Sequence, residues 1–177
     1  MTKELLYPST RRDDYKSLID SSCYYVDKTP ILKYLFSQNR SQVLLITRPR
    51  RFGKSLTISM ISAFLSLNLS DPKNKERHCA LFKDQEIFKD TAFCNQFMGQ
   101  FPVIFISLKS VTALNFTGAY HMLGLLINSL VDSFNFLLDS NKLSSTDKAF
   151  LNKLLDLDYI KSESAISEIK ISLKKIN

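Results

Sequence analysis

The sequence predicts an α/β fold in which several helices cover a small parallel sheet in a three-layer core. Two short apolar runs, Val43–Ile46 and Phe101–Ile106, are flanked by polar residues and are typical of strands buried on both faces. Longer stretches elsewhere repeat apolar residues at helical spacing. Hydrophobic residues occupy 45% of the 177 positions and charged residues 23%, which is ordinary for a folded domain and excludes a disordered or low-complexity chain.

The predicted elements of the first half follow one another closely. Residues 1–25 are polar on average and are expected to cover the domain rather than build its core. Thr29 offers a hydroxyl N-cap and Pro30 suits the first helical position, so a helix should begin there. After the apolar run that ends at Ile46 and a basic loop, a second helix should begin at Lys54. The apolar residues of this second helix share one face: Leu56, Met60, Ala63, Phe64 and Leu67.

The second half is expected to be mainly helical. One helix should span residues 116–138, another should begin at Ser144 or Ser145 and end near Leu155, and a stripe from Ile166 to Ile176 predicts a last one. Two strands make a very small sheet for this fold class, and a sheet-covering helix is normally followed by another strand. We therefore expect a single incomplete domain, the front part of a longer protein, with a core over 26–111 and a helical part over 112–177. The alternative is a complete, helix-rich small domain.

The excess of positive charge lies in the first third of the chain. Residues 1–60 hold 11 basic and 5 acidic groups, whereas residues 61–177 hold 13 and 12. A basic half indicates a phosphate-bearing partner, although solubility alone would also explain it.

Several other classes of protein are disfavoured. The three cysteines are odd in number and lack CxxC spacing, which argues against a disulfide framework or a zinc site. The N-terminus has no signal-peptide core, and polar residues such as Asn115, His121 and Asn128 interrupt the uncharged stretch 110–131. We therefore expect a cytoplasmic protein with no membrane span.

A candidate phosphate loop lies between the first predicted strand and the helix that follows it. Residues 53–55, Gly-Lys-Ser, match the second half of the pattern G-x-x-x-x-G-K-[ST], and the strand before and helix after are the context that the motif requires. The backbone N–H groups of Gly53, Lys54, Ser55 and Leu56 would hold phosphate oxygens at the positive end of the helix dipole. Lys54 would neutralise charge on the terminal phosphates, and the Ser55 hydroxyl would ligate Mg²⁺.

The loop departs from that pattern at its start, where Arg48 stands in place of the first glycine. Either the opening turn is built differently, or the loop is not a nucleotide site, because a residue other than glycine resists positive φ. Arg48, Arg50 and Arg51 add three charges beside the loop. They would brace a polyphosphate or a nucleic-acid backbone, or simply form a solvated basic turn.

Two longer segments make a family resemblance specific. YYVDKTPILKYL and VLLITRPRRFGKSLTISMISAFL resemble the AAA-ATPase-like domain family of prokaryotic proteins, and the similarity runs from about Asp14 to about Val111. The resemblance implies a P-loop NTPase core that uses ATP and Mg²⁺, with Arg48 as a habitual residue. It also implies assembly into a homo-oligomer in some members, and a nuclease-like domain further along the chain in others.

The resemblance also assigns site residues. Lys54 and Ser55 fall on the family's phosphate-binding positions, with Lys54 expected to act in catalysis and Ser55 on the metal. The expected nucleotide-binding set is Arg50, Arg51, Phe52, Gly53, Lys54, Ser55 and Leu56. Asp27 and Lys28 match the YVDKT segment, whose role the sequence does not provide; the plain alternative for Asp27 is a helix-start cap.

One part of an ATPase is missing from the sequence. Hydrolysis normally uses an acidic residue at the end of a second strand, yet Thr47 and Ser107 follow the two apolar runs. Two functions therefore remain. One is an ATP-binding module that hydrolyses ATP with Mg²⁺ in the full-length protein but is inactive as this chain; the other is a non-hydrolysing module that binds nucleotide or nucleic acid.

Overall fold

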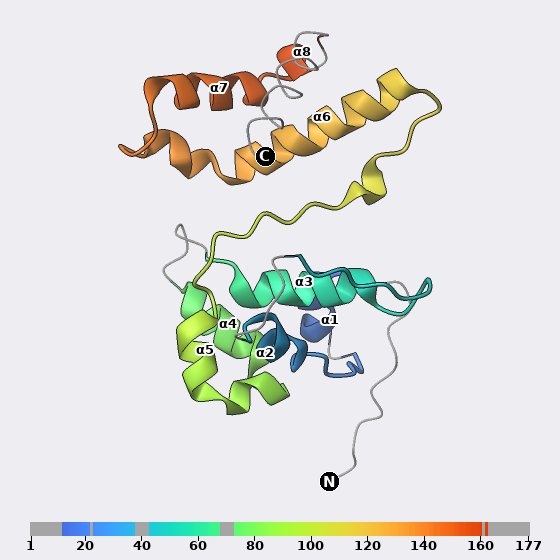
Figure 1. Cartoon of the computed structure of the whole chain (residues 1–177), viewed down its shortest axis with the longest axis vertical. Coiled ribbons are helices and arrows are strands. Elements are labelled where there is room, and N and C mark those ends of the chain that lie inside the picture. The colour runs from blue at the N-terminus through green and yellow to red at the C-terminus, as the bar shows by residue number, and fades with distance from the viewer. Residues whose placement is uncertain (1–11, 22, 38–42, 68–72, 161, 163–177) are drawn as a thin grey trace. The chain divides into compact units, whose positions relative to one another are not determined.

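The computed structural model describes residues 12–21, 23–37, 43–67, 73–160 and 162. The chain divides into two compact units, Met1–Phe105 and Ile106–Asn177, which are described separately (Figure 1). The expected single domain, with its core over 26–111 and its helical part over 112–177, stays a prediction.

Unit 1 is a cluster of short helices around an aromatic core. Its largest fully buried side chains include Tyr15, Phe64 and Phe82. The Tyr15 and Phe82 rings stack with centroids 5.1 Å apart, and Phe64 meets Phe82 edge-on at 5.2 Å. Such ring pairs add to the apolar area that they bury. The elements are α1 (Tyr15–Asp20), α2 (Ile31–Leu35), α3 (Lys54–Leu65), α4 (Asn74–Phe82), the 3-10 turn η1 (Glu86–Lys89) and α5 (Thr91–Phe97).

Helix α3 begins at Lys54, as the sequence predicts. Met60 and Phe64, on the predicted apolar face, are fully buried in the core of unit 1. The end of the helix is held by backbone bonds, since the Phe101 N–H donates to the Leu65 carbonyl (2.9 Å) and the Leu67 N–H donates to the Phe101 carbonyl (2.7 Å). The helix is therefore fixed at its middle and its C-terminal end.

The predicted parallel sheet is not present in the part of the chain that the structure describes, so the α/β prediction is wrong there. Neither Val43–Ile46 nor Phe101–Ile106 forms a strand, and the parallel pairing that occurs is an isolated bridge between Ser66 and Phe101. Val43 and Leu45 are 81% and 82% exposed, and Ile104 is 65% exposed. An apolar run indicates that a segment is hydrophobic. A buried strand also needs neighbouring strands that pair with its backbone, and the run itself does not specify these.

Two further features of unit 1 differ from the sequence analysis. Helix α2 begins at Ile31 with Pro30 at its N-cap, and no side chain caps it. The Thr29 hydroxyl instead accepts a hydrogen bond from the N–H of Ile87, 58 positions along the chain (3.2 Å). Helix α1 was not predicted, because only Tyr15 and Leu18 of its six residues are buried and so short an element carries almost no periodic signal.

Unit 2 is built on a long helix. Its elements are the 3-10 turn η2 (Leu108–Ser110), α6 (Phe116–Ser133), the 3-10 turn η3 (Asn135–Asp139), α7 (Ser145–Leu155) and α8 (Leu157–Ile160). The predicted cap of α7 is confirmed, since the Ser144 hydroxyl accepts from the Asp147 N–H at 3.1 Å. Asn128 on α6 donates to the carbonyls of Leu154 and Leu155, both at 2.9 Å, and so satisfies the end of α7.

Of two further helices predicted in the second half, one is confirmed in part and the other is not tested. The helix predicted over 116–138 begins at Phe116 but continues as 3-10 turns after Phe134. The helix predicted from Ile166 to Ile176 lies outside the described residues. Among the residues that are described, no helix is both long and apolar enough to cross a membrane.

We predict that Gly124→Ala destabilises unit 2. Alanine normally stabilises a helix interior by about 1 kcal/mol over glycine. At Gly124, however, a Cβ would overlap the Cγ2 of Ile160, so overpacking should lower the free energy of unfolding by about 1–3 kcal/mol. Urea denaturation followed by circular dichroism measures the change. The penalty should shrink in an Ile160→Ala background; an equal penalty in both backgrounds would contradict the packing explanation.

Candidate phosphate-binding loop

The loop that precedes α3 has an alternating backbone. Arg51 has φ 67° and Gly53 has φ 72°, whereas Phe52 between them keeps the usual negative sign. Alternation of this kind turns successive N–H groups toward one side and forms a concave nest that suits an anion. The loop thus shares one backbone feature with anion-binding nests, although it lacks the first glycine of the usual phosphate-loop pattern.

The position of the left-handed residues explains why Arg48 is tolerated. Among the described residues, Arg51 is the one residue other than glycine with positive φ, so Arg48 lies in the ordinary range. The opening turn is therefore built differently. The left-handed conformation that strains a residue other than glycine falls on Arg51, three residues after Arg48. Such strain costs of order 1 kcal/mol.

The N-terminus of α3 has no side-chain cap. Gly53 is the N-cap residue, and the first bond of the helix runs from the Thr57 N–H to the Gly53 carbonyl at 2.9 Å. The N–H groups of Lys54, Ser55 and Leu56 precede that bond and cannot pair within the helix. They lie at the positive end of a twelve-residue helix, which favours negative charge.

The Lys54 ammonium lies on the loop that it follows. Its Nζ donates to the carbonyl oxygens of Arg48 (2.5 Å) and Pro49 (2.9 Å). An ammonium group has three donors, so these bonds use two of them. The side chain therefore closes the loop through its carbonyls and holds a positive charge beside the nest.

The remaining predicted site residues lie on the surface around the nest. Arg50, Arg51 and Phe52 are exposed in the loop, and Ser55 is exposed on the first turn of α3. In the described part of the chain, no group of three or more His, Cys, Asp or Glu residues is placed to hold a metal ion. A magnesium ion at this loop would accordingly take the Ser55 hydroxyl, phosphate oxygens and water as ligands.

Sequence reasoning singled out Lys28 without finding a role for it, and the structure brings it to the loop. Its Nζ donates to the carbonyl of Phe52 at 3.3 Å, although the two residues are 24 positions apart. The signal in the sequence was the YVDKT resemblance, which does not indicate where the segment folds. The loop thus carries two ammonium groups, one from its own helix and one from the segment before α2.

Among the described residues of unit 2, no carboxylate lies at the end of a strand. Asp156 lies between α7 and α8, and its Oδ1 accepts from the Asp158 N–H at 2.9 Å. This agrees with the sequence interpretation of the stretch as a helix end.

Comparison with known proteins identifies one family. A family model described as Predicted AAA-ATPase matches residues 12–167, which extends the resemblance beyond the loop and across both units. No curated protein and no solved structure matches the chain. Fusion to a nuclease domain, which the resemblance suggested, is not shown by this match.

We predict that two loop substitutions change stability in opposite directions. Arg51→Gly should raise the free energy of unfolding by up to about 1 kcal/mol, because glycine adopts positive φ without strain. Gly53→Ala should lower it by about 1 kcal/mol for the same reason. Urea denaturation of both variants checks the signs. If Arg51→Gly proves as destabilising as Gly53→Ala, the alternating backbone of the loop is refuted.

Proposed function

The chain belongs to the predicted AAA-ATPase family, and on that premise we propose that it binds the phosphates of ATP on loop 48–55. One observation carries the proposal: the alternating backbone at Arg51 and Gly53 leads directly into the uncapped start of α3, with the Lys54 ammonium on the same loop. The family match supports the nucleotide, and the loop supports the place.

Each loop residue has a separate task in this proposal. The N–H groups of Gly53, Lys54, Ser55 and Leu56 donate to phosphate oxygens and orient them. Lys54 adds a point charge near the terminal phosphates. The Ser55 hydroxyl would help to hold Mg²⁺, which would neutralise phosphate charge when bound. Gly53 allows the ligand to approach the backbone closely.

The proposal for this chain is ATP binding, and hydrolysis is not part of it. Among the described residues, the two exposed apolar segments lead into Thr47 and Ser107 and not into a carboxylate. A carboxylate at the end of a strand, which orients the attacking water, is a recurring part of ATP hydrolysis. Neither described segment leads into one, so we expect bound ATP to stay intact.

A second candidate function is nucleic-acid binding. Its support is the exposure of Arg48, Arg50 and Arg51 beside the nest, since arginine pairs well with phosphate in any polyanion. The nucleotide remains the first candidate because the family match supports it directly.

We predict that Lys54→Ala weakens binding of a fluorescent ATP analogue at least ten-fold. The substitution removes both the charge and the two bonds that close the loop through Arg48 and Pro49. Fluorescence anisotropy measures the affinity. Lys75→Ala is the matched control, because Lys75 is exposed on α4 and its loss changes the net charge equally.

The same assay separates the two candidate functions. Unchanged affinity in Lys54→Ala would refute the nucleotide site. Displacement of the analogue by duplex DNA, with an affinity that falls steeply as salt increases, would favour the nucleic-acid candidate instead.

We also predict that the 177-residue chain releases no phosphate from ATP above the background rate. The reason is that neither of the two described apolar segments leads into a carboxylate. A coupled phosphate assay with Mg²⁺ measures turnover, with Lys54→Ala as the blank. Turnover that disappears in Lys54→Ala would show that a catalytic acid acts within these residues.

A further inference from the structure

Lys28 approaches the loop at Gly53, the glycine with positive φ that precedes α3. Besides donating to the Phe52 carbonyl, its Nζ lies 2.9 Å from the point where a Cβ on Gly53 would stand. The absence of a side chain at Gly53 therefore serves two purposes: it permits φ 72°, and it leaves room for this ammonium group.

Both lysines donate to backbone carbonyl groups of the loop. Lys54 takes the carbonyls of Arg48 and Pro49, and Lys28 takes the carbonyl of Phe52. Carbonyl oxygens repel an anion, whereas N–H groups attract it. Two ammonium groups that occupy the carbonyls leave the N–H groups of the loop and of the first turn of α3 for a ligand.

The main chain at Lys28 is fastened on both sides. The Asp27 carboxylate accepts from the Thr29 N–H and from the Glu86 N–H at the start of η1, both at 2.7 Å. The N–H of Lys28 itself donates to the Tyr25 hydroxyl at 3.3 Å. Burial raises the pKa of Tyr25 to about 12, so this hydroxyl stays protonated at neutral pH.

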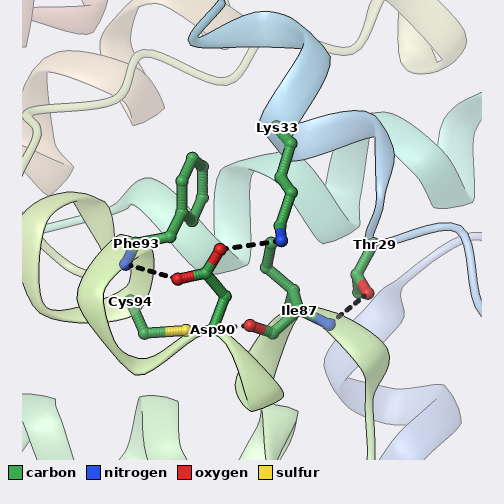
Figure 2. A network of polar contacts seen from close by, with 6 residues as sticks. All are labelled: Thr29, Lys33, Ile87, Asp90, Phe93 and Cys94. Atoms are coloured by element: carbon green, nitrogen blue, oxygen red, sulfur yellow. Dashed lines mark hydrogen bonds and ion pairs between the residues drawn. The ribbon is translucent and has the colours of Figure 1, made fainter.

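The segment is also held to α5 and η1 (Figure 2). Fully buried Thr29 accepts from the Ile87 N–H at 3.2 Å, and Lys33 forms an ion pair with Asp90 at 2.7 Å. Together with the bond between Asp27 and the Glu86 N–H, these contacts join the residues on either side of Lys28 to a different part of unit 1. The segment from 27 to 33 is therefore attached to η1 and to the residue that caps α5, and the Lys28 side chain extends from it to the loop.

We propose that Lys28 is a second phosphate-binding cation of the loop, which recognises the polyphosphate chain of the nucleotide and not its base. This inference rests on the proposed function, because it concerns the same site. An ammonium group has three donors, and the bond to Phe52 uses one. A lysine side chain is a flexible point charge, so it can follow phosphate oxygens while its main chain stays fixed.

The simpler alternative is that Lys28 only holds the loop in shape through the Phe52 carbonyl. Lys28→Gln separates the two roles, because glutamine keeps an N–H donor for that carbonyl and loses the charge. Lys28→Arg keeps the charge and should keep most of the binding. The urea midpoint of each variant reports whether the loop and its support remain folded.

The experiment compares fluorescent ATP and AMP analogues on the full 177-residue chain, with inorganic tripolyphosphate as competitor. We expect Lys28→Gln to weaken ATP and tripolyphosphate about ten-fold and AMP much less, with Lys28→Arg within about three-fold of the original chain. Lys54→Ala and Lys75→Ala are measured alongside.

Each outcome bears on one proposal. If Lys54→Ala loses the ATP analogue while Lys28→Gln binds ATP and tripolyphosphate normally, the role of Lys28 is overturned and the nucleotide site stands. An equal loss for ATP and AMP in Lys28→Gln overturns the polyphosphate role in favour of a structural one. If the unsubstituted chain binds no analogue, the proposed function itself fails.

Discussion

The charged start of α3 depends on the apolar middle of the same helix. Met60 and Phe64 are fully buried, and Phe64 contacts the Phe82 ring edge-on in the core of unit 1. A helix that is fixed by its core face cannot shift or rotate without exposing these side chains, at a cost of several kcal/mol. Its first turn therefore stays in one orientation, and the N–H groups there point at a constant place.

The loop and its support are arranged around this fixed helix. Gly53 provides both the left-handed turn into α3 and the space next to its Cα that Lys28 approaches. Asp27 and Thr29 attach the Lys28 segment to the backbone of Glu86 and Ile87. Gly53 thus lies where the start of α3, the loop and the Lys28 segment meet.

Local signals were enough to predict the parts of the molecule that depend on near neighbours. The apolar spacing after Lys54 placed the start of α3, and Ser144 marked the start of α7, because helical periodicity and caps act within three or four residues. The sequence around the loop also indicated the family, which the match over residues 12–167 confirms.

Features that depend on distant partners were not predictable. The apolar run Val43–Ile46 reads as a strand, but strand formation depends on which segment pairs with it, and the described structure has no such segment there. Thr29 has the ordinary features of an N-cap, yet its hydroxyl is used by Ile87, 58 positions away. Lys28 reaches the loop only because the chain folds back on itself, and no periodicity in the sequence records that contact.

The central claim is that backbone N–H groups at the start of α3 converge on an anion. A titration of isotopically labelled chain with inorganic tripolyphosphate, followed by amide NMR, tests this directly. The account predicts that the amide signals of Gly53, Lys54 and Ser55 shift downfield and saturate together, with small changes in α6 and α7. Saturating shifts confined to other parts of the chain, or no shifts at concentrations that displace the ATP analogue, would contradict it.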